Sequence, residues 1–251
     1  QFDATRDKVL SLIEFSTQRD SMPFAVFKPS GLGRSEIWEA SGKGKLQGPL
    51  MEEWKRVVNR YDKLAHAAKE RGLMLLIDAE ETWIQNGADA LCTQMMFRYN
   101  KDAPVVFNTL QCYRYDRIDY IKELHLQAKS KDINLGFKVV RGAYMEKETE
   151  RSRSLGYPSP ICRDKSHTDE IFDTVVSYIL KNINDISLFI GSHNEESTLK
   201  AISLMEKYSI APNDRRVWFG QLYGMSDHIT YNLADKGYNV VKYIPFGPLK
   251  D

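Results

Sequence analysis

Short apolar runs rich in β-branched and aromatic residues alternate with longer amphipathic segments along this 251-residue chain. This alternation is the feature that most constrains the fold. Each run is apolar at consecutive positions, which is typical of a strand buried on both faces. Segments of helical length separate the runs, so the pattern predicts βαβ units and a parallel sheet covered by helices. The predicted strands span residues 24–28, 73–79, 104–111, 135–140, 187–193, 216–222 and 239–246.

Amphipathic patterns between these strands predict helices over residues 51–71, 84–100, 116–131, 168–184, 195–208 and 226–236. Asn194 is followed by two glutamates, the pattern of a helix N-cap with an acidic first turn. Gly72, Gly136 and Gly237 each precede a strand, where helices commonly end in a left-handed residue. The segment 29–50 is rich in glycine and serine, and it is predicted to be a long or partly ordered loop.

A closed barrel fits this pattern better than an open doubly wound sheet. The open sheet usually carries a glycine-rich dinucleotide loop after its first strand. The candidate here, SGLGRSE at 30–36, has only two of the three glycines. Seven predicted strands leave a (β/α)8 barrel one strand short, and the chain length suits one such domain. We therefore expect an α/β fold of the TIM-barrel type.

Composition excludes several classes of function. The net charge is +1, with 35 basic and 34 acidic side chains, so no global field attracts nucleic acid or anionic lipid. Cys92, Cys112 and Cys162 lie far apart and form no zinc-ligand spacing, which favours a reducing compartment and no metal. No apolar run approaches the ~20 residues of a membrane span. The chain opens on Gln1 without a signal peptide, so we expect a trimmed start.

Polar side chains stand at the carboxyl ends of six of the seven predicted strands. In a parallel barrel these ends meet at one mouth, where barrel enzymes place their active sites. For any one position, ordinary fraying of a strand into solvent is an equally acceptable interpretation, but six together favour a site. The residues are Lys28, Asp78 with Glu80 and Glu81, Gln111, Lys138 with Arg141, Ser192-His193-Asn194, and Gln221.

The stretch FKVVRGAYMEKE, residues 137–148, carries two cations at the end of a buried strand. Side chains alternate between the two faces of a strand, so Lys138 and Gly142 share one face while Arg141 lies on the other. If Lys138 faces the barrel mouth, Gly142 permits a close approach to the backbone there. Arg141 is then expected to point outward and to pair with an acidic neighbour.

Two further strand-end patterns allow more than one interpretation. His193 has no metal-ligand spacing, so it is expected either to contact an anion or cofactor or to be a hydrogen-bonded structural residue. Ser192 and His193 point to opposite faces, which excludes a nucleophile–base pair. Glu80 and Glu81 either join Asp78 in a metal cluster or cap the next helix. His125 is predicted to be a surface residue of its helix.

Together these strand ends resemble one family, the flavin-dependent proline dehydrogenases, especially the stand-alone enzymes of the eukaryotic type. FAVFKPSGLGR (24–34) is similar to the family's lysine-bearing strand, although more weakly than the rest. The six stronger stretches occur in the family's order: LLIDAEETW (75–83), FNTLQCY (107–113), FKVVRGAYMEKE (137–148), SHNEES (192–197), FGQLYGMSD (219–227) and VVKYIPFGP (240–248).

The resemblance implies a distorted (β/α)8 barrel that binds FAD at its mouth without a dinucleotide-binding motif. It implies oxidation of L-proline to Δ1-pyrroline-5-carboxylate, with hydride passing from proline C5 to flavin N5 and electrons passing on to a membrane quinone. Peripheral membrane association follows, without nucleic acid. A bacterial protein would then lie in the cytoplasm at the inner face of the membrane, and a eukaryotic one at the matrix side of the mitochondrial inner membrane.

The resemblance also assigns roles to individual positions. Lys28, Asp78, Lys138 and Tyr243 form the expected catalytic set. Tyr243 would press on the proline ring where hydroxyproline carries its hydroxyl; plain barrel packing is the other interpretation of this residue. Substrate contacts fall on Lys28, Asp78, Ala143, Leu222 and Tyr243. Cofactor contacts fall on Gln111, Lys138, Val140, Gly142, Ala143, Tyr144, Thr168, Ser192, His193, Asn194, Gln221 and Leu222, and no metal is implied.

The chain departs from the family pattern at both ends. The family continues into a helix with a tyrosine, two arginines and a glutamate, and the arginines clamp the substrate carboxylate; this sequence stops at Asp251. The first barrel strand is expected before Gln1. We therefore expect residues 1–251 to be a single catalytic domain that is truncated or disordered at both ends. Three alternatives remain: a hydroxyproline dehydrogenase, a lyase forming a Schiff base on Lys28 or Lys138, and a non-catalytic flavin- or quinone-side binding barrel.

Overall fold

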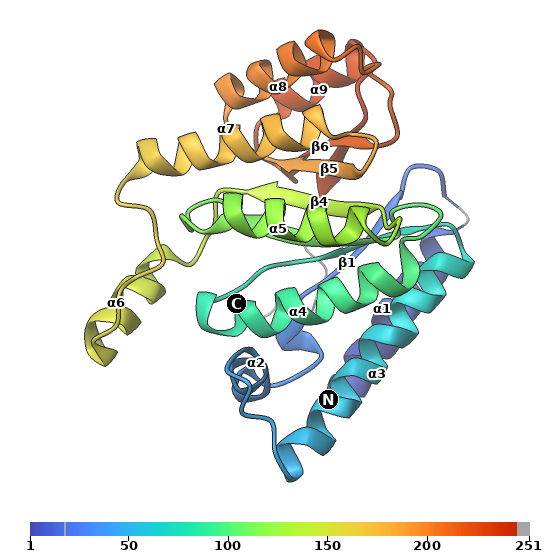
Figure 1. Ribbon diagram of the computed structural model, residues 1–251. Coiled ribbons are helices and arrows are strands. Elements are labelled where there is room, and N and C mark those ends of the chain that lie inside the picture. Colours follow the sequence, from blue (N-terminus) through green and yellow to red (C-terminus); the bar gives the residue numbers. More distant parts are fainter. Residues whose placement is uncertain (18, 245–251) are drawn as a thin grey trace.

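The computed structural model describes residues 1–17 and 19–244, which form a curled sheet with helices on its outer face (Figure 1). Seven strands pair in chain order, and every pair is parallel. All of the predicted strands are confirmed; the tail of the last one, residues 245 and 246, lies outside the described residues. The strands are β1 Phe24–Phe27, β2 Met74–Ile77, β3 Val106–Gln111, β4 Leu135–Val140, β5 Ile186–Gly191, β6 Val217–Leu222 and β7 Val240–Tyr243.

Six helices confirm the predicted ones to within a few residues at each end: α3 Pro49–Glu70, α4 Thr82–Tyr99, α5 Arg117–Lys129, α7 Lys165–Lys181, α8 Glu195–Lys207 and α9 Asp227–Asp235. Three were not predicted: α1 Phe2–Ser16, α2 Ser35–Gly42 and α6 Met145–Leu155. Figure 1 shows α6 projecting away from the sheet, and α1 packs alongside α3.

The prediction of a loop over residues 29–50 was wrong for much of that segment. It contains the 3₁₀ turn η1 (Pro29–Gly31) and the helix α2. Trp38 of α2 is fully buried, and its indole Nε1 donates to the carbonyls of Pro29 and Gly33, both at 3.1 Å. A short helix gains most of its stability from such tertiary contacts, which local composition does not report.

The inner face of the curled sheet is filled by large apolar side chains. Leu76, Phe107 and Phe189 are buried there. The ring of Phe24 on β1 lies edge-on to the rings of Phe189 and Trp218, with centroids 5.2 Å apart in each case. Residues of β1 and β6 therefore meet across the interior, as they do in a barrel. Within the described residues, no backbone pairing joins β1 to β7.

Glycines have two different roles in this fold: some adopt a left-handed backbone conformation, and one makes room for a neighbouring side chain. Gly72 and Gly237 have φ of +63° and +79°, which confirms the left-handed conformation predicted before their strands. The same prediction was wrong for Gly136, which lies inside β4 without a positive φ. A Cβ at Gly136 would stand 2.7 Å from the ring of Phe107. This glycine therefore makes room for a neighbouring aromatic ring.

His125 was predicted to be a surface residue, and that prediction was wrong. Its side chain is buried where α5 packs against α7. Nδ1 lies 2.8 Å from the hydroxyl of Tyr178, and Nε2 lies 2.9 Å from Oδ2 of Asp185. Both partners are more than 50 residues away in sequence, so the helical pattern around His125 alone could not reveal them.

None of the helices in the described ranges is both long and apolar enough to cross a membrane. In the same ranges, no group of three histidine, cysteine or acidic side chains is placed to hold a metal ion. The three cysteines are buried free thiols.

We expect Gly136→Ala to lower the free energy of unfolding by about 1–3 kcal/mol, because the new methyl group overlaps a buried ring. Gly31→Ala is the matched control, since its Cβ would meet only a side-chain methyl of Thr5, at 3.2 Å. Urea unfolding followed by circular dichroism measures both variants. Equal losses for the two would contradict the packing role of Gly136.

Candidate active site

Inward-facing positions change from apolar to polar as the strands approach their carboxyl ends. Along β2 and beyond it these positions are Met74, Leu76 and Asp78, and along β4 they include Gly136 and Lys138. The backbone N–H of Asp78 still donates to β1, at Phe27 O, over 2.9 Å. The strand alternation therefore places a carboxylate and an ammonium group directly above the aromatic floor of the barrel.

Asp78 is the centre of a cluster formed by four strand ends. Lys138 Nζ donates to Oδ1, and the hydroxyl of Tyr243 donates to Oδ2 at 2.6 Å. Lys28 Nζ lies 3.6 Å from Oδ2, and the ammonium of Lys138 lies 4.8 Å from the centroid of the Tyr243 ring. Asp78 and Lys138 are 7% and 8% exposed, whereas the side chain of Lys28 is 51% exposed. The structure thus brings together all four residues of the expected catalytic set.

The cluster fixes the charge states of its members. Burial alone would raise the pKa of Asp78, but the charge of Lys138 and the hydrogen bonds from Lys138 and Tyr243 outweigh it and hold that pKa below its usual value. Burial and the adjacent Asp78 carboxylate raise the pKa of Tyr243 far above its usual value, so its hydroxyl stays a donor. Partial burial opposes the charge on Lys28, but Asp78 and Tyr144 together raise its pKa. Lys28 is therefore a charged ammonium that is open to solvent.

Gln111 and Glu80 lie beside this cluster. Gln111 Nε2 donates to the backbone carbonyl of Glu80 over 2.8 Å, while its Oε1 is buried and has no partner among the described residues. The carboxylate of Glu80 accepts hydrogen bonds from Ser30, so it does not cap α4 as one interpretation proposed. Glu81 occupies the N-cap position of α4 without a capping bond, and it pairs with Lys147 at 2.8 Å.

The turn between β4 and α6 leaves its backbone exposed. Gly142 has φ of +123°, and a Cβ there would stand 2.5 Å from the ring of Tyr113. The close approach predicted at this glycine is thus made by Tyr113. Ala143 follows as an exposed residue, and Tyr144 stands at the N-cap position of α6. Val140, at the end of β4, packs against Gly191 of β5.

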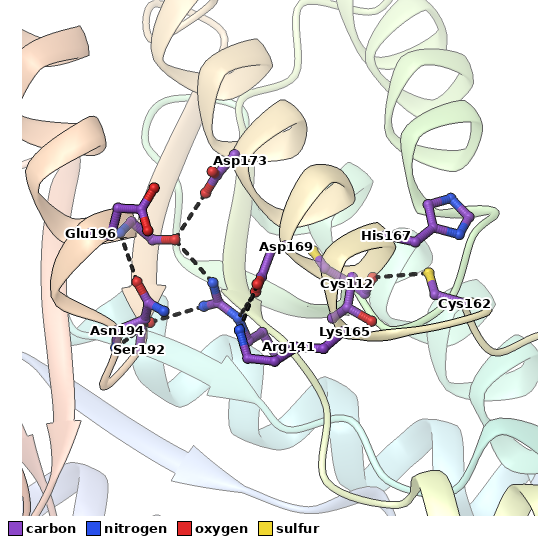
Figure 2. A network of polar contacts seen from close by, with 12 residues as sticks. Cys112, Arg141, Cys162, Lys165, His167, Asp169, Asp173, Ser192, Asn194 and Glu196 are labelled. Atoms are coloured by element: carbon purple, nitrogen blue, oxygen red, sulfur yellow. Dashed lines mark hydrogen bonds and ion pairs between the residues drawn. The ribbon is translucent and has the colours of Figure 1, made fainter.

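Arg141 points outward and forms the network of Figure 2. Its Nε donates to Asp169 at 2.7 Å, Nη1 to the hydroxyl of Ser192 at 3.2 Å, and Nη2 to that of Ser197 at 2.9 Å. The predicted pairing with an acidic neighbour is confirmed. Asn194 caps α8 as predicted, because its Oδ1 accepts from Ser197 N at 2.8 Å. The network fixes the start of α8 beside the end of β4.

Two other predicted cofactor residues, His193 and Thr168, have hydrogen-bond partners outside the Asp78 cluster. His193 Nδ1 is 3.0 Å from the hydroxyl of Ser226, and burial together with Lys242 lowers the pKa of His193. Thr168 lies in the first turn of α7, where its hydroxyl donates to the backbone of the same turn. Neither residue has a hydrogen bond or ion pair to Asp78, Lys138 or Lys28 among the described contacts.

The side chains of Gln221 and Leu222, at the end of β6, point to opposite faces of the sheet. Gln221 faces away from the interior, where its Oε1 accepts from Thr230 at 2.8 Å and its Nε2 donates to Ser192 O at 3.3 Å. Leu222 alternates to the inner side, is exposed, and is in register with Tyr243. Leu222 is thus the member of the pair that borders the cluster.

Sequence reasoning did not anticipate the partners Ser30, Tyr113 and Asp169. Ser30 follows Lys28 by two residues, and Tyr113 follows Gln111 by two, so both lie in predicted strand-end motifs. Nothing in the local pattern indicates which distant group each one meets. Asp169 stands near the start of the predicted helix 168–184, where acidic residues are too common for the pattern to identify a partner.

A family model described as proline dehydrogenase matches residues 1–251. The chain belongs to the proline dehydrogenase family. It is 38% identical over 250 residues to the carbapenem antibiotics biosynthesis protein CarD of Pectobacterium carotovorum subsp. carotovorum, covering 99% of this chain and 64% of that protein. It is 36% identical over 199 residues to the human mitochondrial proline dehydrogenase 1, covering 78% of this chain and 33% of that protein. The chain thus spans between a third and two thirds of these relatives.

Two solved structures share the fold of this chain. Proline utilization A of Bdellovibrio bacteriovorus, inactivated by N-propargylglycine, superposes with a TM-score of 0.86 at 21% identity, over 99% of this chain and 27% of that one. A variant of proline utilization A from Bradyrhizobium japonicum superposes with a TM-score of 0.81 at 21% identity, over 96% of this chain and 24% of that one. The predicted distorted barrel of the TIM type is confirmed.

Asp78→Asn is expected to destabilise the protein by about 3–5 kcal/mol at pH 7, because it leaves the ammonium of Lys138 buried without its counter-charge. The folded-state pKa of Asp78 lies below the unfolded value of about 3.9, so the carboxylate stabilises the fold above that pH. The difference between wild type and variant should therefore shrink as the pH falls from about 4 through the folded-state pKa.

Urea unfolding at pH 7 and at a series of pH values down to 3 measures this difference. Glu52→Gln is the control, since Glu52 pairs with Lys55 on an exposed helix face, and it should not change the unfolding midpoint. A difference between wild type and Asp78→Asn that stays constant with pH would contradict the assignment.

Proposed function

We propose that this protein oxidises L-proline to Δ1-pyrroline-5-carboxylate with FAD as cofactor. The observation that carries the proposal is the Asp78 cluster. In it the buried ammonium of Lys138 is ion-paired with Asp78, while a second ammonium, that of Lys28, stays charged and exposed. Membership of the proline dehydrogenase family supports the same reaction. The task of such a site is mainly to position a small ring, and it requires neither a metal nor an acylated nucleophile.

The substrate is proposed to lie over the cluster with its carboxylate toward Lys28. Asp78 is already bonded to Lys138 and Tyr243, so Lys28 at 3.6 Å retains donors for an anionic ligand. The exposed side chain of Leu222 and the ring of Tyr243, which are in register across β6 and β7, would border the ring carbons. Ala143 would complete this wall. Proline is small and has one carboxylate, so a single local cation suits it.

Several features at the mouth fit a flavin. Gln111 Oε1 is a buried acceptor that meets no donor from residues 1–17 and 19–244, and the turn at Gly142 leaves backbone accessible. The buried charge of Lys138, held by Asp78, favours negative charge that develops beside it. When bound, the flavin supplies at N5 the acceptor for the hydride that leaves proline C5. The proposed cofactor contacts are Gln111, Lys138, Val140, Gly142, Ala143, Tyr144, Thr168, Ser192, His193, Asn194, Gln221 and Leu222.

A Schiff-base lyase is disfavoured by the charge states at the mouth. A lysine that attacks a carbonyl must be a neutral amine, and it is commonly obtained by lowering the lysine pKa. The pKa of Lys28 is raised, and Lys138 is bound to a carboxylate. Borohydride trapping with a carbonyl substrate should therefore label neither lysine.

We propose a membrane quinone as the electron acceptor, which requires peripheral contact with a membrane. The human relative is named as mitochondrial, and the Pectobacterium relative is bacterial. The corresponding locations are the matrix side of the inner mitochondrial membrane and the inner face of a bacterial membrane.

A second candidate role is the same oxidation within a biosynthetic route, because the relative that covers 99% of this chain is named for carbapenem biosynthesis. Loss of growth of a gene-deletion strain on proline as sole nitrogen source would favour breakdown instead.

The purified protein should be yellow and should lose its visible flavin absorbance anaerobically when L-proline is added. Hydroxyproline should bleach it at least about tenfold more slowly at equal concentration, because Tyr243 occupies the space that the added hydroxyl needs. Stopped-flow spectroscopy measures both rates. Equal rates would favour the hydroxyproline dehydrogenase, and a yellow protein that proline never bleaches would favour the non-catalytic barrel.

Lys28→Met should raise KM for proline at least about tenfold while the flavin content of the purified protein stays unchanged, because a charge-assisted hydrogen bond to the substrate is lost. Steady-state kinetics and the ratio of visible to ultraviolet absorbance measure the two quantities. Lys165→Met is the control, since Lys165 pairs with Asp169 on the outer surface. An unchanged KM in Lys28→Met would remove Lys28 from the substrate site.

A further inference from the structure

We propose that Glu80 is a positioning residue that holds Lys28 in place for the substrate carboxylate. This inference rests on the proposed function, because it assigns Lys28 to the substrate. Glu80 is only 6% exposed, and its carboxylate points at the turn η1 that follows Lys28. Neither the cofactor nor the substrate contacts proposed above include it.

The carboxylate of Glu80 bonds to a single residue of that turn with both of its oxygens. Oε2 accepts from the backbone N–H of Ser30 at 2.8 Å, and Oε1 accepts from its hydroxyl at 2.7 Å. Hydrogen bonds to a charged acceptor are about twice as strong as neutral ones. Ser30 stands two residues after Lys28, and Gly31 N donates back to the carbonyl of Lys28 at 3.0 Å. The backbone around Lys28 is therefore tied to Glu80.

Glu80 also belongs to the segment that carries Asp78, the partner of Lys28. The N–H of Asp78 donates to Phe27 O on one side of Lys28, and Glu80 binds Ser30 on the other. These two links fix the base of the Lys28 side chain relative to the carboxylate that its ammonium approaches at 3.6 Å. A long, half-exposed lysine otherwise has many rotamers, and ordering it on binding weakens affinity.

The other side-chain hydrogen bonds at and just after the turn η1 join it to the outer helices α2 and α3. Trp38 Nε1 binds the carbonyls of Pro29 and Gly33 from α2, and Arg60 Nη1 donates to Leu32 O from α3, at 3.0 Å. These bonds hold the turn to the outer helices. Among the side-chain hydrogen bonds of the described residues, only those between Glu80 and Ser30 join the turn to the end of β2. Glu80 is thus suited to positioning Lys28, beyond stabilising the turn.

Binding of the flavin is expected not to depend on the side chain of Glu80. Gln111 Nε2 binds the backbone carbonyl of Glu80, which remains after any substitution. Loss of the Glu80 carboxylate should therefore weaken substrate binding while leaving flavin content intact. An interaction lost equally from the bound ground state and the transition state raises KM and leaves kcat unchanged.

The test is a double-mutant cycle between Glu80→Ala and Lys28→Met. Glu80→Ala should raise KM for proline about tenfold with kcat nearly unchanged. It should weaken binding of cyclopentanecarboxylate, which keeps the ring and carboxylate but has no amine, by the same factor in calorimetry. In the Lys28→Met background, Glu80→Ala should add no further change, because its effect passes through Lys28. Glu80→Gln, which keeps one acceptor oxygen, should give an intermediate value.

Glu53→Ala is the matched control. Glu53 accepts two hydrogen bonds from Arg34, just after the same turn, at 2.8 and 2.9 Å, but it does not touch residues 29–31. It should leave both constants unchanged. If Glu80→Ala fails to fold, Ser30→Ala takes its place in the cycle; it removes one of the two bonds and should raise KM about threefold.

The outcomes separate the two proposals. Equal weakening by Glu80→Ala in the wild-type and Lys28→Met backgrounds would overturn the positioning role and show a general structural effect. Unchanged affinity in Glu80→Ala would overturn it as well. A wild-type protein that binds neither proline nor cyclopentanecarboxylate would overturn the proposed function, and the positioning role with it.

Discussion

The buried ion pair between Lys138 and Asp78 is the constraint on which the rest of the site depends. Two charges leave water at the carboxyl ends of β4 and β2, and in a low-dielectric interior each is tolerated only because the other is present. Tyr243 supplies the further hydrogen bond that satisfies the second carboxylate oxygen. The pair therefore requires three strands to hold their register, and any sheet that placed them otherwise would bury an uncompensated charge.

The curl of the sheet makes this arrangement possible. Tyr243 stands on β7 and Asp78 after β2, yet their side chains meet, just as Phe24 of β1 meets Trp218 of β6 lower in the interior. Apolar side chains, several of them aromatic, fill the interior, and Gly136 leaves the volume that one ring needs. The apolar floor fixes the curvature, and the same curvature brings the polar strand ends into contact. The curl of the sheet thus determines both the packing of the apolar interior and the contacts among the polar strand ends.

Sequence patterns predicted the features that depend on neighbouring residues. Strand alternation placed Lys138 and Arg141 on opposite faces of their strand, and the polar strand ends indicated where the candidate site lies. The pattern could not report contacts between distant segments. The bond between Glu80 and Ser30 spans 50 residues and the partners of His125 lie more than 50 residues away, so helix capping and a surface position were the natural but wrong interpretations. The burial of Trp38 in α2 was missed for the same reason.

The three cations near the mouth, Arg141, Lys138 and Lys28, differ in how firmly their side chains are held, because their partners and their burial differ. Arg141 is bound by three partners in the outer network, and Lys138 is buried against Asp78, so both have fixed geometry. Lys28 is half exposed and lies beyond hydrogen-bond distance of Asp78. An ammonium that is already charged and half exposed, and whose backbone is anchored, can bind an anion with little reorganisation. The fold thus separates a rigid, buried charge on Lys138 from an exposed and available charge on Lys28.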